Sequence, residues 1–324
     1  MRLFTTTIST ALLILGVTSL SSCRHKDVLY EEPLTRDVEI RFDWTNAPDA
    51  NPESMAVYLF ERNTGKQLRY IFTDRRGGTV NLPYGQYDAI CMNADNTDWA
   101  EHHHTDDIEQ FATHTHDATT LAAQTLSVST LPSLPSRADA PERVAQTPGM
   151  LYSDRRNEWS FNYTDTTKVF MMYPSEAVCH YTVTVIGAEN IDAFDGKTID
   201  ATLSGMAEGF VHGQQAPTTT HSTLAFTVKA DMEKQILYSE FLTFGEPTDN
   251  DLTHQLTLYA RLDDGTGWYQ TTDVTDQVKN APDPTHVNIV IRNISLPRNV
   301  DKSEAGGFRA DVNDWQTNRI DLPF

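Results

Sequence analysis

Alternation between polar and apolar residues is the feature that most restricts what this chain can fold into. Residues 37–44 change between the two classes at every position, which is the period of a strand with one buried face. The apolar side of this segment holds Val38, Ile40, Phe42 and Trp44. Similar short runs recur along the chain and end at turn-forming pairs such as Gly77-Gly78 and Asp264-Gly265. Together with the lack of a long amphipathic helix, this pattern predicts an all-β protein made of β-sandwiches.

The strand and loop signals divide the chain into two parts. Residues 37–160 predict an N-terminal β-sandwich domain that includes a long polar loop over residues 95–147, which is rich in Asp, His, Thr, Ser and Pro. Residues 161–324 predict a C-terminal β-sandwich domain, since runs rich in β-branched residues, such as 180–186, alternate in the same way. A chain of 324 residues has the length of two ordinary domains.

Residues 1–22 have the features of a bacterial lipoprotein signal peptide. Arg2 supplies the positive charge, residues 11–17 form a short apolar run, and Leu20-Ser21-Ser22-Cys23 resembles a lipobox. Cleavage before Cys23 would leave a cysteine that carries acyl chains such as palmitate. The alternative is an ordinary secretory signal beside a coincidental cysteine. The apolar run is too short to span a bilayer, and no later run reaches 18 apolar residues, so the lipid would be the membrane anchor.

Residues 23–36 would then form a lipidated tether. Lys26-Asp27 follows the cysteine closely, as in the surface-export signals of Bacteroidetes lipoproteins, although Val28 ends the acidic run after one residue. We therefore expect a lipid-anchored protein at the cell outer membrane, exposed on the surface.

Charge and cysteine content exclude two classes of protein. The chain carries 25 Lys+Arg against 45 Asp+Glu, for a net charge of −20. No basic surface is left over to neutralise phosphates, which excludes sequence-independent binding of nucleic acid. Three cysteines are too few for a disulfide framework. Besides Cys23, the chain has Cys91 and Cys179, which we expect to be buried thiols, with a disulfide between them as the alternative.

Two groups of side chains could bind a ligand. Five of the 11 histidines gather between residues 102 and 116. Of these, His114 and His116 would share one face of a strand, a spacing that zinc, copper or nickel can use, and the alternative is a solvated polar loop. Among the tryptophans, Trp99 lies in a polar segment and is the best candidate for stacking on a sugar, with packing as the alternative.

No motif of catalysis or cofactor binding is present. The chain lacks the nucleophile elbow Gly-x-Ser-x-Gly, the dinucleotide fingerprint Gly-x-Gly-x-x-Gly, the Walker A pattern and the zinc motif His-Glu-x-x-His. No pair of carboxylates stands in a recognisable setting for glycoside hydrolysis. We therefore predict that the protein is not an enzyme and has no cofactor.

Several segments resemble a family of Bacteroidales lipoproteins of unknown function. In the second half these segments are 203–207, 240–245, 273–278, 280–283 and the ending 306–316. In the first half, the strand that ends in Asp43-Trp44, together with Tyr58 and Asn93, fits the same family. This family is similar to the fimbrillin-like proteins, and within them to the anchor and minor subunits of type V pili.

The resemblance implies two tandem transthyretin-like β-sandwich domains and assembly by strand exchange with other fimbrillin-like subunits. In strand exchange, the open groove of one subunit accepts a strand from its neighbour. In the stalk subunits of such pili, a protease cuts after an arginine and frees the groove, and Arg36 and Arg62 are the candidate positions here. An anchor subunit keeps its lipid and is not cut. Anchor and stalk roles both stay open at this point.

The last residues offer a candidate strand for such an exchange. If residues 318–324 are extended, Ile320, Leu322 and Phe324 share one face. The segment would then pair with a partner subunit. The alternative is a final edge strand of the protein's own second domain, which Pro323 would shorten.

Three functional hypotheses follow. The leading one is a structural subunit or anchor of a pilus or other adhesive assembly, attached to the outer membrane by lipid. The alternative is a surface glycan-binding lipoprotein of a polysaccharide-uptake system. A metal-dependent enzyme built on the histidine cluster comes third.

Overall fold

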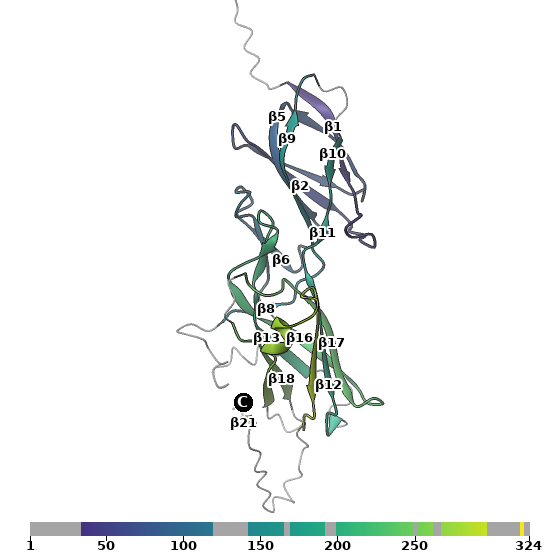
Figure 1. The fold of residues 1–324 in the computed structure, drawn as a ribbon, viewed down its shortest axis with the longest axis vertical. Coiled ribbons are helices and arrows are strands. Elements are labelled where there is room, and N and C mark those ends of the chain that lie inside the picture. The colour runs from purple at the N-terminus through teal and green to yellow at the C-terminus, as the bar shows by residue number, and fades with distance from the viewer. Residues whose placement is uncertain are drawn as a thin grey trace, which may run out of the picture.

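The computed structural model describes residues 34–118, 142–164, 169–191, 199–248, 252–261, 267–296 and 318–320. Regular structure in these residues is nearly all β-strand, so the predicted all-β fold class is confirmed (Figure 1). The described helix α3 spans Thr275–Lys279. Among the same residues, no helix has the length and apolar composition that crossing a bilayer requires.

Two sheets pack face to face at the N-terminal end of the molecule (Figure 1). The sheet that we call the front sheet has the order β10-β1-β4 and consists of β1 (Thr35–Phe42), β4 (Gly77–Pro83) and β10 (Val169–Met172). The back sheet has the order β11-β9-β5-β2-β3 and consists of β2 (Met55–Glu61), β3 (Gln67–Phe72), β5 (Gly85–Asn93), β9 (Tyr152–Phe161) and β11 (Ser175–Glu176). Their facing sides enclose one apolar core.

The alternation at residues 37–44 gives this core its first strand. Val38, Ile40 and Phe42 are buried between the two sheets, as the pattern predicts. Trp44 lies beyond the end of β1, packs half-buried against the core, and donates a hydrogen bond from Nε1 to the Arg75 carbonyl at 2.8 Å.

A third sheet, which we call the long sheet, forms the other end of the molecule. It has the order β20-β12-β17-β16-β13-β18-β19-β21, with β8 beside β16. Its strands are β8 (Val144–Gln146), β12 (Cys179–Ile186), β13 (Ile199–Ala207), β16 (His221–Asp231), β17 (Ile236–Thr243), β18 (Gln255–Arg261), β19 (Gly267–Asp273), β20 (His286–Arg292) and β21 (Asn318–Ile320). The long sheet encloses a core of its own, to which α3 contributes Val278.

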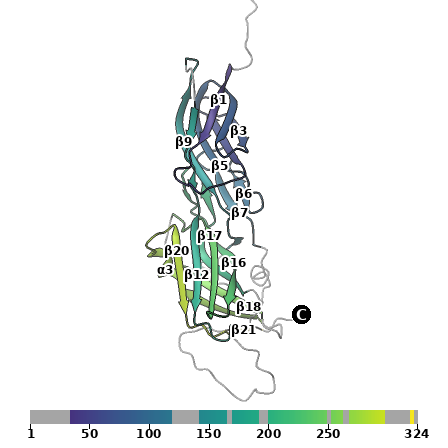
Figure 2. The same cartoon turned by 90° about the vertical axis from the view of Figure 1, so that its right-hand side faces the viewer.

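A small sheet joins the two ends of the molecule (Figure 2). This joint sheet has the order β15-β14-β7-β6. Its strands are β6 (Ala100–His103), β7 (Ala112–Thr115), β14 (Gly209–Val211) and β15 (Ala216–Pro217). One hairpin therefore comes from each half of the chain, and the two hairpins meet where β7 pairs antiparallel with β14.

The joint sheet is where the structure differs from the long polar loop predicted for residues 95–147. That segment contains β6 and β7, and β8 pairs in parallel with β16 of the long sheet. These strands are short and polar on one face, so their composition resembles that of a loop. In addition, β7 pairs with β14 and β8 with β16, and a local sequence pattern does not reveal such distant partners.

Both cysteines of the described region are free thiols. Cys91 is fully buried in the core between the front and back sheets, and burial raises the pKa of its thiol well above the usual value. Cys179 is partly buried beside the core of the long sheet. The expectation of buried thiols therefore holds for Cys91, and the alternative disulfide is wrong.

Gly77 provides a test of how tightly β1 is held. Its φ of +104° is unfavourable for other residues, and a Cβ at this position would lie 2.0 Å from the Ile40 carbonyl oxygen of β1. We expect Gly77→Ala to lower the free energy of unfolding by more than about 2 kcal/mol, because a clash with backbone adds to the strain of a positive φ. Urea unfolding followed by tryptophan fluorescence measures this.

Gly65→Ala is the matched control. Gly65 also has a positive φ, +71°, but a Cβ there would meet no atom within 4 Å. Gly65→Ala should therefore lower the free energy of unfolding only by the strain of a positive φ, about 1 kcal/mol. Equal losses for the two variants would contradict the close approach of Gly77 to β1.

Candidate functional site

The N-terminal strand is the first candidate for a functional element. β1 lies in the middle of the front sheet, parallel to β10 on one side and antiparallel to β4 on the other. Its inward side chains Val38, Ile40 and Phe42 are each at most 4% exposed. Without β1, a groove would remain between β10 and β4 with an apolar floor. A strand from another molecule could fill such a groove by main-chain pairing and alternate side chains.

The back sheet is unusual because its central strands are buried on both faces. Met55, Val57 and Leu59 of β2 face the core between the front and back sheets. The alternate residues Ala56, Tyr58 and Phe60 face the joint sheet instead, where they form a separate apolar cluster with Ile90, Met92, Trp99, Phe111, Phe210 and others. The joint sheet thus covers the outer face of the back sheet with an apolar contact. In this contact the Tyr58 and Phe111 rings lie edge to face, with their centroids 4.7 Å apart.

A buried chain of hydrogen bonds crosses this contact. His212, which follows β14, lies between Thr113 of β7 and Ser153 of β9. Its Nε2 is 2.7 Å from Thr113 Oγ1, and its Nδ1 is 2.8 Å from Ser153 Oγ. Thr113 Oγ1 is also 2.9 Å from His102 Nδ1 of β6. Each ring nitrogen of the fully buried His212 therefore has a partner, as burial of a polar group requires.

Burial keeps these two histidines neutral. It lowers the pKa of His212 to about 3 and the pKa of His102 to about 4, because charging either ring would cost solvation. A neutral imidazole can donate from one nitrogen and accept at the other, which suits a position between two hydroxyl groups. The chain therefore holds the back sheet to both hairpins of the joint sheet at neutral pH.

Arg155 makes a second polar contact at the same place. From β9 its guanidinium donates to the Glu109 carboxylate, with Nη1 at 3.0 Å from Oε2, and to the Gly213 carbonyl. Glu109 belongs to the β6–β7 connection and Gly213 to the β14–β15 connection. Arg155 thus ties the tips of both hairpins to the back sheet.

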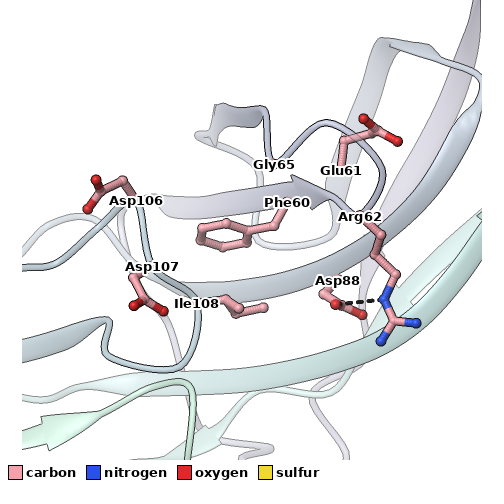
Figure 3. Close-up of a pocket in the computed structure, with 8 residues that line it drawn as sticks. All are labelled: Phe60, Glu61, Arg62, Gly65, Asp88, Asp106, Asp107 and Ile108. Carbon is pink, nitrogen blue, oxygen red and sulfur yellow. Dashed lines mark hydrogen bonds and ion pairs between the residues drawn. The ribbon is translucent and has the colours of Figure 1, made fainter.

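An open hollow of about 650 Å³ lies beside these contacts. Figure 3 shows Asp106 and Asp107 at one end of it and the Arg62–Asp88 ion pair at the other. The residues that line it are Phe60, Glu61, Arg62, Gly65, Asp88, Asp106, Asp107 and Ile108.

Asp107 and Asp88 in this hollow accept hydrogen bonds from the protein's own backbone and side chains. Asp107 accepts hydrogen bonds from the Glu109 backbone N–H at 3.0 Å and from Gln110 at 2.9 Å. Asp88 accepts from Arg62 Nε at 2.9 Å and from the Glu158 backbone N–H at 2.8 Å. The first two bonds hold the β6–β7 loop, and the other two connect the β2–β3 turn and β9 to β5.

The structure brings the predicted metal pair close to two further residues of the same hairpin. The His103 and His114 rings lie 4.7 Å apart, and Glu101 has carboxylate oxygens 3.7 Å from His103 Nε2 and 3.8 Å from His116 Nε2. Within the described part of the chain, however, no group of His, Cys, Asp and Glu has the arrangement that holds a metal ion. Metal binding by His114 and His116 stays a prediction without support from this geometry.

Trp99 lies inside the protein rather than on its surface. It is 8% exposed and belongs to the cluster between the back sheet and the joint sheet. A Cβ at Gly149 would lie 2.5 Å from its Nε1, so the backbone at Gly149 closely approaches the indole. This packing leaves no open aromatic face on which a sugar could stack.

The C-terminal segment enters the described structure only at residues 318–320. These residues form β21, which pairs antiparallel with β19 at the edge of the long sheet, with Ile320 opposite Gly267. Cys23, Leu322 and Phe324 lie outside the described residues.

The residues that connect the two halves were not predicted from the sequence. Thr113, Ser153 and His212 are distant from one another in the chain, and none belongs to a recognisable motif. The nearest signal is the apolar run 55–60 without alternation, since a strand that is apolar on both faces must be covered on both.

The comparisons with known proteins agree with the fold. The family model described as Domain of unknown function (DUF5119) matches residues 22–227, which is more than half of the chain. A curated protein of Bacteroides ovatus named "Putative fimbrium anchoring subunit Fim4B" is 27% identical over 81 residues. These residues are 25% of this chain and 24% of the relative, so the match spans about a quarter of that protein.

Two solved structures show the same fold at low identity. The structure of "a putative adhesin" from Bacteroides ovatus has a TM-score of 0.61 and 18% identity, with 86% of this chain and 99% of that chain covered. The structure of "putative polysaccharide binding proteins (DUF1812)" from Bacteroides thetaiotaomicron has a TM-score of 0.53 and 11% identity, with 80% and 91% covered. The predicted resemblance to a family of unknown function is thereby confirmed, and these two Bacteroides structures share the fold of the chain.

The neutral histidines predict a pH dependence of stability. In the unfolded chain both would titrate near the ordinary value of 6.5, above their folded values of about 3 and 4. The unfolded state therefore binds more protons below pH 6.5, and the free energy of unfolding should fall as the pH drops from 6.5 toward 4. Each group contributes about 1.4 kcal/mol per pH unit in that range.

His212→Asn separates this effect from that of the carboxylates. Denaturant unfolding at several pH values between 6.5 and 4 should give a slope smaller by about one proton than in the unsubstituted chain. Because the slope is compared and not the absolute stability, any loss caused by the substitution itself does not affect the result. An unchanged slope would mean that His212 takes up a proton in the folded protein.

Proposed function

The chain belongs to the family described as Domain of unknown function (DUF5119), and on this premise we propose that it is a structural anchor subunit of a fimbrial assembly, fixed to the outer membrane by lipid on Cys23. Support comes from the fold shared with the Bacteroides ovatus adhesin structure and from the match to the curated relative, whose name describes a fimbrium anchoring subunit.

The observation that carries the anchor role is the way β1 is connected. Release of β1 by an arginine-specific protease needs a basic residue between β1 and β2, but residues 43–54 contain neither Arg nor Lys. Arg36 and Arg41 lie inside β1, where Arg41 pairs with both neighbouring strands and Arg36 pairs with Leu82 of β4. Proteases prefer exposed loops, so these two positions are protected.

Arg62 is no better as a cleavage position. It follows β2, so a cut there would detach β2 together with β1. β2 lies between β5 and β3 and contributes Met55, Val57 and Leu59 to the core, and its loss would destroy the sandwich rather than open a groove. A subunit that keeps β1 suits the base of an assembly, where the groove does not need to accept a strand.

The N-terminus is well placed for a lipid anchor. β1 begins at Thr35, so a short tether separates Cys23 from the folded protein. Fully extended, the segment between Cys23 and Leu34 reaches on the order of 40 Å. Acyl chains on Cys23 would thus hold the front and back sheets close to the membrane, with the rest of the protein available to partners on the cell surface.

We propose two β-sandwich units that differ slightly from the division read from the sequence. The front and back sheets form the first unit, whose last strand β11 ends at Glu176, and the long sheet begins with β12 at Cys179. Residues 100–115 leave the first unit to pair with β14 of the second half.

The C-terminal segment is the proposed donor to the next subunit. β21 is an edge strand with a single described partner, β19, so it can leave the long sheet without opening the core. Ile320, Leu322 and Phe324 would share the inward face of a donated strand. The proposed partners are other fimbrillin-like subunits, which would accept this strand by β-augmentation.

Lipidation gives the first test in cells that make the protein. Cys23→Ala should abolish incorporation of labelled palmitate, because the thiol that accepts the acyl chains is gone. Cys179→Ala is the matched control and should keep the label. Incorporation of the label into Cys23→Ala would contradict the lipid anchor.

Crosslinking in the same cells tests the assembly. The parent chain should be recovered in a high-mass ladder with fimbrillin-like subunits. Replacing Ile320, Leu322 and Phe324 by Asn should remove the ladder, because a donated strand needs its apolar face. Arg319→Ala with Asp321→Ala changes the opposite face and should leave it intact.

Two outcomes would count against this assembly. A ladder that survives the three Asn substitutions would overturn the C-terminal donor while leaving a fimbrial role. Recovery of a TonB-dependent transporter with glycan-handling lipoproteins would overturn the fimbrial role itself.

A further inference from the structure

One edge of the long sheet is formed by β20. Among the described strands β20 pairs with β12 alone, in parallel, and its inward residues Val287, Ile289 and Ile291 belong to the core. Edge strands expose unpaired N–H and C=O groups and so offer a template for pairing with another chain. β20 would therefore be open to strand addition along its free side.

The sequence of β20 is well suited to such pairing. Residues 286–292 read His-Val-Asn-Ile-Val-Ile-Arg, with four β-branched residues, no proline or glycine and one permanent charge. Short segments of this composition stack readily into extended sheets when their edge is exposed. The edge therefore needs protection if the protein is to avoid uncontrolled association.

Gln277 of α3 occupies the middle of this edge. The Val290 backbone N–H donates to Gln277 Oε1 at 2.7 Å, and Gln277 Nε2 donates to the Val290 carbonyl at 3.2 Å. A side-chain carboxamide carries the same donor and acceptor as a peptide group, so it reproduces the pair of bonds that a neighbouring strand would make. Figure 2 shows α3 beside β20 at the edge of the long sheet.

The ladder geometry explains why one residue is enough. The Thr285 carbonyl accepts from the His180 N–H, and the Asn293 N–H donates to the Ile186 carbonyl. The backbone N–H and C=O groups of the odd-numbered residues of β20 therefore point toward β12. Those of the even-numbered residues Asn288, Val290 and Arg292 point to the free side of the strand. An added strand needs these positions in succession, and Gln277 takes the central one.

The helix holds Gln277 firmly in this position. Val278 of α3 is 2% exposed and the preceding Val274 is fully buried, both in the core of the long sheet. The backbone N–H of Val274 donates to the His254 carbonyl at 2.9 Å, and the His254 N–H donates to Thr275 Oγ1 at 2.9 Å. The carboxamide is therefore presented by an anchored element and not by a free loop.

We propose that Gln277 is an edge cap that prevents β20 from pairing with β20 of a second copy of this chain. Two β20 strands could pair antiparallel about a twofold axis through Val290, which would place Asn288 opposite Arg292 and no like charges opposite each other. The strand is thus complementary to itself, so a second copy of this chain is the partner that an uncovered β20 fits. This proposal does not depend on the anchor role.

The test uses the chain from residue 23 onward with Cys23→Ser, which removes the acylation site. Gln277→Ala and Gln277→Met are compared with this parent by sedimentation velocity over a range of concentrations. Met keeps the length and helix propensity of Gln but lacks the carboxamide. We expect both variants to raise the association constant at least tenfold, and the Val290 amide to exchange its hydrogen at least tenfold faster at concentrations where the chain is monomeric.

Two further variants make the result specific to the edge. Lys279→Ala changes an exposed side chain of the same helix and should behave like the parent. Adding Val290→Lys to Gln277→Ala should restore the association constant of the parent, because a lysine on an edge strand opposes pairing. Rapid exchange at Val290 without increased association in either Gln277 variant would overturn the proposal, and so would association that Val290→Lys leaves unchanged.

Discussion

The outer face of the back sheet is the constraint on which the rest of the architecture depends. β2 and its neighbour β5 carry large apolar side chains on both faces, so a sandwich with the front sheet buries only half of them. Exposing Tyr58, Phe60, Ile90 and Met92 to water would cost several kcal/mol, at roughly 25 cal/mol per Å² of apolar surface. The joint sheet covers this face, and because its hairpins come from both halves of the chain, covering it also connects the two ends of the molecule.

The polar residues at this contact are a consequence of the same arrangement. Strands that cross from one unit to another bring backbone and side-chain polar groups into a region without water. Each of these groups then needs a partner, since an unpaired one costs about 1–3 kcal/mol. His212 between Thr113 and Ser153 meets that requirement for three elements at once. The contact is therefore specific in register as well as apolar.

Local patterns predicted the parts of the fold that are locally determined. The alternation in β1 gave its buried residues correctly, and the β-branched run at 180–186 became β12. The joint sheet escaped prediction because β6 and β7 are short and rich in His and Thr, and because β14, which pairs with β7, lies far along the sequence. Trp99 was misjudged for a related reason: a polar neighbourhood in the sequence indicates solvent only when no distant segment covers it. Of the candidate site residues, Cys23 depends on a motif alone, while the role of Gln277 depends on a contact that no motif describes.

The position of β1 also bears on how the protein would respond to mechanical force. A pull on the N-terminal tether reaches the folded protein at Leu34 and acts along β1, across the hydrogen bonds that join it to β4 in an antiparallel ladder and to β10 in a parallel ladder. In this direction all the bonds on both sides of β1 share the load at once, in shear, instead of opening one after another as in a peeled hairpin. The side chains of Val38, Ile40 and Phe42 would have to leave the core in the same step. The strand next to the tether is thus arranged to resist tension, the load that the anchor role proposed above would place on it.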